Sequence, residues 1–115
     1  MGEASWKDFD LAKLVERAEN SDAPYLEFLR VPQLSCGIYT LEVGSTDNQS
    51  SHDEDEVYFV LKGHGTIQIA GETRPIRPGA IFYVPADTSH TFEQIDEGLS
   101  LLVFFGSGGP SGADV

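Results

Sequence analysis

One short segment of the chain combines side chains that bind metal ions or move protons. The stretch SSHDEDEVYFVLKGHG, residues 50–65, places His52 ahead of four consecutive acids and then continues as aromatic and β-branched residues. The chain has three histidines, and the other two are His64 and His90. Imidazole and carboxylate groups are typical ligands of divalent transition metals, whereas a solvated acidic loop before a strand needs no ligand at all. The segment by itself is therefore consistent with a metal site and with a solvated acidic loop.

The separation of His52 and Glu56 decides whether they can share an ion. In a straight strand that rises about 3.3 Å per residue, their α-carbons would be roughly 13 Å apart, too far for two ligands that each lie about 2 Å from one metal. A shared site therefore needs a bend at residues 53–55, which are poor strand formers. After the bend, strand alternation points Glu56 inward together with Tyr58. Glu54 is the competing ligand if the strand stays straight.

The other two histidines have different surroundings. His64 lies between two glycines in KGHG, where we predict an exposed turn. His90 opens the strand-like segment HTFEQI, and antiparallel strands about 4.8 Å apart can bring it beside His52. Two imidazoles and one carboxylate on one side of an ion are typical of Fe(II), and the same donors suit Mn, Ni or Zn. A histidine held by a structural partner is the alternative.

Strands make up most of the framework that must position these groups. Ser5 and the apolar residues at helical spacing after it predict one amphipathic helix over residues 8–20, ended by Pro24. The rest alternates short β-branched and aromatic runs with Gly, Pro or acidic turns, which predicts an antiparallel barrel or sandwich. KGHG and AGE are expected as tight turns. The expected strands are residues 25–31, 35–43, 56–62, 66–70, 74–77, 80–84, 91–95 and 100–105.

Length and charge limit the classes of protein that the chain can belong to. Its 115 residues fit one domain, with a helix and linker over 1–24, a barrel over 25–106 and a flexible tail over 107–115. The formal net charge of −12 repels nucleic acids and anionic membranes, so neither is an expected partner. The sequence shows no long apolar run and no signal peptide, so we expect a cytoplasmic protein. Cys36 is the only cysteine, which permits no internal disulfide, and we expect it to be a core residue.

At these residues the sequence resembles the cupin family, whose small β-barrel carries two metal-binding motifs. The resemblance spans about residues 38–105. The first motif is a spaced series of Gly, His, His, Glu and Gly, and its places are occupied here by Gly44, Ser50, His52, Glu56 and Gly63. The second is a spaced series of Gly, Pro, Gly, His and Asn, and its places are occupied by Gly79, Pro85, Asp87, His90 and Gln94.

The resemblance implies an all-β fold, a small antiparallel β-barrel or jelly roll with one N-terminal helix. It also implies a divalent transition metal, Fe, Mn, Ni or Zn, with His52, Glu56 and His90 as three of the usual four ligands. Ser50 stands in the place of the fourth, and its neutral hydroxyl is a poor ligand, so the site is expected to be more open or weaker. Asp87 is acceptable in a glycine place because Asp tolerates turn conformations.

The resemblance also implies a metal-dependent enzyme that acts on a small organic molecule by dioxygenase-like or isomerase-like chemistry. Glu54 or Tyr58 would be the catalytic proton-transfer group. We expect Tyr58, Phe92 and either Phe82 or Tyr83 to line the cavity. The alternatives are a non-catalytic small-ligand-binding or sensory cupin with structural or no metal, and a barrel in which the histidines have structural partners only. Residues 24–34 could add an edge strand to a partner, which indicates a possible homodimer.

Overall fold

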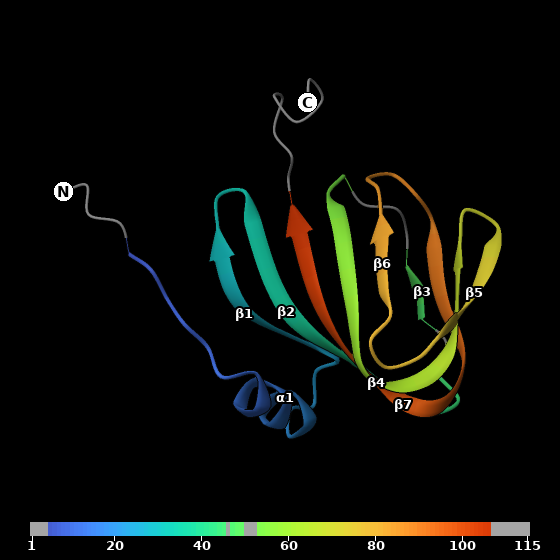
Figure 1. Cartoon of the computed structure of the whole chain (residues 1–115), viewed down its shortest axis with the longest axis horizontal. Coiled ribbons are helices and arrows are strands. Elements are labelled where there is room, and N and C mark those ends of the chain that lie inside the picture. Colours follow the sequence, from blue (N-terminus) through green and yellow to red (C-terminus); the bar gives the residue numbers. More distant parts are fainter. Residues whose placement is uncertain (1–4, 46, 50–52, 107–115) are drawn as a thin grey trace.

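A computed structural model describes the chain over residues 5–45, 47–49 and 53–106, with side chains described outside residues 47–49 (Figure 1). This part contains one helix and seven strands, which confirms the all-β fold with an N-terminal helix. In chain order the elements are α1 (Leu11–Glu19), β1 (Tyr25–Val31), β2 (Leu34–Leu41), β3 (Asp47–Gln49), β4 (Asp55–Ile69), β5 (Glu72–Ile76), β6 (Ile81–Val84) and β7 (His90–Gly106).

The strands form one antiparallel sheet that curls around the core. Its order is β1-β2-β7-β4-β5, with β3 paired to β7 and β6 paired to β4. The two long strands, β4 and β7, stay paired along most of their length and curve together (Figure 1). Strands β1 and β5 stand at the two ends of this order, so the described strands form a curled jelly-roll sheet that is not closed.

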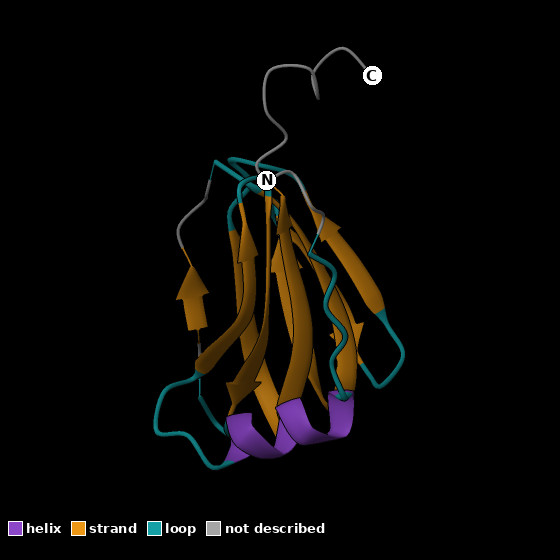
Figure 2. Cartoon of the chain, turned by 90° about the vertical axis from the view of Figure 1, so that its left-hand side faces the viewer, coloured by secondary structure: helices purple, strands orange, loops and turns teal. Residues whose placement is uncertain are grey.

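The inner face of the curled sheet holds the main core. Along β4, residues 56, 58 and 60 are buried and residues 57 and 59 are less so, as strand alternation predicts. The buried members of this core are Tyr39, Leu41, Tyr58, Val60, Ile67, Ile76, Val84, Phe92, Ile95, Leu99, Leu101 and Val103. A second cluster lies on the outer face, where Leu14 and Ala18 of α1 cover Ile38. Figure 2 shows α1 lying across one end of the strands.

The helix begins later than the sequence analysis predicts. Asp10 caps it, because the side chain of Asp10 accepts hydrogen bonds from the backbone N–H groups of Ala12 at 3.0 Å and Lys13 at 3.4 Å. Ser5 was therefore the wrong cap, and Asp is as good an N-cap residue as Ser. In the part of the chain that the structure describes, no helix is long and apolar enough to cross a membrane.

Two expected chain reversals are bends within long strands. KGHG was predicted as a turn, but β4 runs through it and His64 pairs with Glu97 of β7. The segments 91–95 and 100–105 likewise belong to one strand, β7. Glycine here permits irregular pairing rather than a hairpin, and the β4–β7 register shifts three times between residues 60 and 66 of β4. Strand β3 was missed, since Asp and Asn are poor strand formers.

The AGE turn is confirmed. Ala70 and Gly71 connect β4 to β5 with φ angles of 51° and 84°. Positive φ at both positions is the signature of the two-residue hairpin turn whose twist matches that of its strands.

Gly63 and Gly71 allow a matched test of the bend in β4. Both have positive φ, but a Cβ at Gly63 would lie 2.7 Å from the Cα of Leu99 and closer still to the carbonyl oxygen of Gly98, whereas a Cβ at Gly71 meets nothing within 4 Å. We expect Gly71→Ala to cost about 1–2 kcal/mol of unfolding free energy and Gly63→Ala more than about 3 kcal/mol. Chemical denaturation measures both. Equal losses would show that the bend tolerates a side chain.

Candidate functional site

The curvature of β4 and β7 brings Glu56 and His90 together from distant points of the sheet. Glu56 pairs with Phe105 near the end of β7, whereas His90, the first residue of β7, pairs with Ile69 at the far end of β4. In a flat sheet these two pairs would be separated by most of the length of β4. In the folded chain, Oε1 of Glu56 lies 3.6 Å from Nε2 of His90. The site therefore depends on the curled tertiary structure.

Tyr58 connects Glu56 and His90. Its hydroxyl donates a hydrogen bond to the carboxylate of Glu56 and lies 3.1 Å from Nε2 of His90. The exposed fractions of Glu56, Tyr58 and His90 are 1%, 1% and 2%. Buried polar groups are costly unless they are hydrogen-bonded, so these contacts stabilise a polar cluster inside an apolar core.

The orientation of the His90 ring is set by its own backbone neighbourhood. Nδ1 lies 3.1 Å from the carbonyl oxygen of Thr88. A carbonyl oxygen can only accept, so Nδ1 is the donor, and Nε2 faces Glu56 and Tyr58. Histidines that bind metals through one nitrogen commonly donate from the other in this way. His90 is therefore held in an orientation suited to ligation through Nε2.

The loop before His90 is tied to the start of β4. The backbone N–H of Ala86 donates to the side chain of Asp55 at 2.9 Å. Asp87 follows with a φ of 61°, which is the left-handed conformation. Asp87 stands where the second motif has its second glycine, and Asp tolerates this conformation, as expected. The roles of Asp55 and Thr88 were missed, since Asp55 was interpreted only as part of a bend and Thr88 acts through its backbone.

Aromatic rings form one wall of the polar cluster. The ring centroids of Tyr58 and Phe92 are 5.1 Å apart, and those of His90 and Phe92 are 6.5 Å apart. Phe82 packs against the same core. Tyr83 is 59% exposed and cannot line the interior, so of the two alternatives only Phe82 faces the core.

The remaining expected site residues are only partly described. Ser50 and His52 lie outside the described residues. Residues 53 and 54 form the expected bend, and Glu54 is half-buried beside it. Within residues 5–45, 47–49 and 53–106, no group of three or more His, Cys, Asp or Glu is placed to hold a metal ion. Glu56 and His90 are thus the two expected ligands that the structure brings together.

Other reactive side chains lie elsewhere. His64 is exposed, as predicted, although it lies in a strand, and its Nδ1 contacts the Glu97 carboxylate at 2.5 Å. Cys36 is buried, and burial raises the pKa of its thiol, which confirms a core residue rather than a nucleophile. Arg74 is exposed and paired with Glu72.

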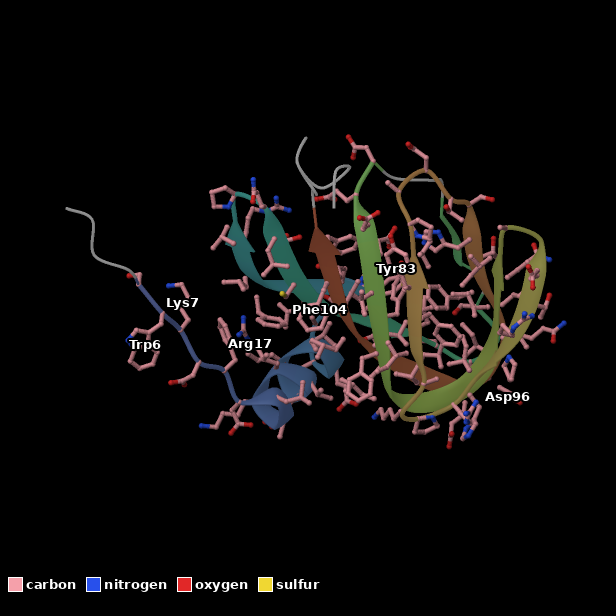
Figure 3. All side chains as sticks on the ribbon, turned by 45° about the horizontal axis from the view of Figure 1, so that its top comes forward. Trp6, Lys7, Arg17, Tyr83, Asp96 and Phe104 are labelled. Atoms are coloured by element: carbon pink, nitrogen blue, oxygen red, sulfur yellow. The ribbon has the colours of Figure 1, made fainter. Side chains whose placement is uncertain are left out.

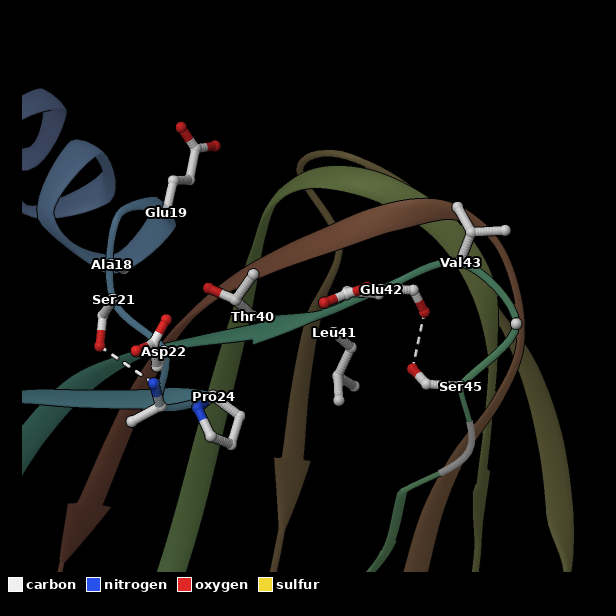
Figure 4. A pocket seen from close by; sticks show the side chains of 12 residues that line it. Ala18, Glu19, Ser21, Asp22, Pro24, Thr40, Leu41, Glu42, Val43 and Ser45 are labelled. Carbon is white, nitrogen blue, oxygen red and sulfur yellow. Dashed lines mark hydrogen bonds between the residues drawn. The ribbon is translucent and has the colours of Figure 1, made fainter.

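A depression of about 660 Å³ lies apart from this cluster, between the end of α1 and the end of β2 (Figure 4). Glu19, Asp22 and Glu42 are its acidic residues, and it has no histidine. Ser21 accepts from the N–H of Ala23 at 3.1 Å, and Ser45 donates to the carbonyl oxygen of Glu42 at 2.6 Å. Both hydroxyls therefore form local hydrogen bonds within the chain connections at the rim of the depression.

Comparison with known proteins identifies the family. The sequence model for the cupin domain matches residues 37–105. An uncharacterized protein of Streptomyces coelicolor is 46% identical over 100 residues, which cover 86% of this chain and 94% of that protein. The chain therefore belongs to the cupin family, as the motif resemblance indicated.

Solved structures agree on the fold. The protein TT1209 from Thermus thermophilus matches with a TM-score of 0.71 and 20% identity over 88% of this chain and 97% of that one. The DMSP lyase DddQ from Ruegeria pomeroyi matches with a TM-score of 0.63 and 22% identity over 66% of this chain. The match spans only 39% of the lyase chain. Both comparisons show the jelly-roll cupin fold.

Replacing Tyr58 by Phe tests the polar cluster. The variant removes a buried hydroxyl that contacts Glu56 and His90, and we expect it to lower the unfolding free energy by about 1–3 kcal/mol, because buried polar groups lose a partner. The control is Tyr83→Phe, since Tyr83 is 59% exposed and its hydroxyl should contribute little. Denaturant titration measures both variants. A neutral Tyr58→Phe would mean that the hydroxyl contributes nothing.

Proposed function

We propose that this cupin binds a divalent transition metal through His52, Glu56 and His90 and acts on a small organic molecule. The observation that carries the proposal is the buried pair of Glu56 and His90, whose donor atoms are 3.6 Å apart. In the motif resemblance each of the two belongs to a different motif, and their proximity in the fold supports the proposal.

The donor pair fits a metal ion. Two ligand atoms that each lie about 2.1 Å from one ion can be separated by up to about 4.2 Å, which 3.6 Å satisfies. Nε2 is the His90 nitrogen that faces Glu56, because Nδ1 donates to Thr88. A carboxylate and an imidazole are donors that Fe, Mn, Ni and Zn accept. His52 would complete the three protein ligands with which a catalytic metal site functions.

A bound metal would polarise a substrate oxygen or activate dioxygen. The chain itself supplies positioning and proton transfer. Tyr58 holds its hydroxyl against Glu56 and 3.1 Å from Nε2 of His90, so it is the described group best placed to give or take a proton. Glu54, at the bend, is the second candidate. Phe92 packs against Tyr58 and His90 and excludes water from this side.

One observation favours a second candidate function, a non-catalytic small-ligand-binding cupin. The Tyr58 hydroxyl already contacts both Glu56 and His90, so the polar cluster is hydrogen-bonded through protein atoms. In this alternative the cluster stabilises the core, and the metal is structural or absent. Under both candidates we propose a cytoplasmic protein with no nucleic-acid or membrane partner, in keeping with the net charge of −12.

Metal retention tests the proposed metal site and separates it from the alternative in which no metal is bound. We expect protein purified without a metal-affinity tag to hold about one equivalent of Fe, Mn, Ni or Zn by elemental analysis, either as isolated or after incubation with the metals. His90→Ala should abolish this retention, because it removes a buried ligand. Ser50→His should tighten it by restoring the missing ligand of the first motif.

The matched control is His64→Ala, which removes an exposed histidine outside both ligand positions and should leave the metal content unchanged. Less than about a tenth of an equivalent of any of these metals in the unmodified protein would contradict the proposal. Looser metal binding in Ser50→His would show that the assignment of the first motif is wrong.

A further inference from the structure

A row of polar side chains crosses three neighbouring strands on the outer face of the sheet. Thr40 of β2 pairs with Ser100 of β7, and Ser100 pairs on its other side with Lys62 of β4. The residues before and after Thr40 and Ser100 belong to the inner core, so strand alternation points these two side chains outward. Figure 4 shows Thr40 and Leu41 on opposite sides of β2. We call Thr40, Ser100 and Lys62 the polar row.

The two hydroxyls of the polar row are buried without a hydrogen-bond partner. Ser100 is 1% exposed. Within the described part of the chain, neither Oγ of Ser100 nor Oγ1 of Thr40 has a partner. Nearly all buried polar groups in folded proteins are hydrogen-bonded, so two adjacent exceptions need a physical reason. A bound polar group would satisfy both hydroxyls, because each can accept as well as donate.

The polar row lines a depression of about 420 Å³ at the bend of β4 and β7. This volume is at the lower end of the range of small-molecule sites, which is about 300–1,000 Å³. The depression adjoins the one in Figure 4. The residues that line both are Glu19, Thr40, Leu41 and Glu42.

A ligand can reach the two hydroxyls if Lys62 moves. The ammonium of Lys62 donates to the carboxylate of Glu19 at the end of α1. Both side chains of this ion pair are substantially exposed. Exposed ion pairs contribute little to stability, so Lys62 can move aside from Ser100 at low cost.

The charge of the two depressions favours a cationic ligand. The acids that line them are Glu19, Asp22, Glu42 and Glu97. Of the described residues that line them, Lys62 is the only lysine or arginine. Figure 3 shows two other basic side chains, Lys7 and Arg17, on the N-terminal segment and on α1. An anion would be repelled here, in a chain whose net charge is −12.

The arrangement of these acids suits a ligand with separated charges better than one metal ion. In the part of the chain that the structure describes, no group of three or more His, Cys, Asp or Glu is placed to hold a metal. The four acids come from the end of α1, the loop after it, the residue after β2 and the middle of β7. They are therefore spread along the two depressions.

We propose that this face binds a small aliphatic di- or polyamine, with one primary ammonium on the hydroxyls of Thr40 and Ser100. A primary ammonium has three N–H donors, and the two hydroxyls and the Glu42 carboxylate supply three acceptors. Hydrogen bonds from a charged donor are stronger than neutral ones. The second ammonium extends into the adjoining depression, which Asp22 lines. This site is separate from the buried pair of Glu56 and His90 on the inner face.

Calorimetric titration with 1,4-diaminobutane at physiological ionic strength tests the proposal. We expect saturable binding of one equivalent, at least about tenfold tighter than the binding of 1,4-butanediol, because the diol has the same length but makes no charge-assisted hydrogen bond. Undetectable binding of the diamine would overturn the proposal. Equal binding of the diamine and the diol would overturn it as well.

Ser100→Ala and Thr40→Val test whether the hydroxyls recognise the amine. Each variant should weaken diamine binding at least about tenfold. Neither should lower the unfolding free energy, because among the described residues the lost hydroxyl has no partner. The matched control is Ser35→Ala, since Ser35 is buried in β2 at 4% exposure but lines neither depression, and this variant should bind the diamine like the unmodified protein. Unchanged binding in either hydroxyl variant would overturn the proposal and would indicate unspecific attraction to the net negative charge.

Discussion

The joint bend of β4 and β7 is the constraint on which the rest of the structure depends. At the bend Gly63 has a φ of 103° and lies against the backbone of Gly98 and Leu99, so closely that no Cβ fits between them. Because the strands stay paired through this bend, their far ends return over the core. The same pairing that joins Glu56 to Phe105 and Ile69 to His90 therefore places Glu56 beside His90.

Enclosure of this polar pair gives the site its chemical character. A carboxylate and an imidazole taken out of water must find partners inside the protein, and Tyr58 and the Thr88 carbonyl supply them. The core around them is apolar and aromatic, which strengthens electrostatic interactions within it. An ion between Glu56 and His90 would interact with both donors in the same low-dielectric surroundings.

The two faces of the sheet differ in how far they are covered. The inner face buries the polar cluster together with the main core. The outer face is only partly covered, because α1 packs over Ile38, whereas Phe104 and Tyr83 stay exposed. Strand alternation produces this division, because the inward Tyr58 has the outward Val57 beside it on β4.

Local sequence determined much of this protein. β-Branched and aromatic runs predicted the strands, alternation predicted an inward Glu56 and Tyr58, and the spaced motifs around Glu56 and His90 indicated the family that the comparisons confirm. These features depend on near neighbours and on periodicity, which are visible in the sequence.

Only the tertiary structure showed that KGHG continues a strand. A glycine with positive φ suits a hairpin turn or a β-bulge equally well, and the long-range pairing with β7 selects the bulge. The sequence also left two other features open. The contact of Tyr58 with His90 depends on strand curvature, which brings residues 58 and 90 together. The exposure of Tyr83 depends on the register between β6 and β4, which sets which side chain of β6 meets solvent.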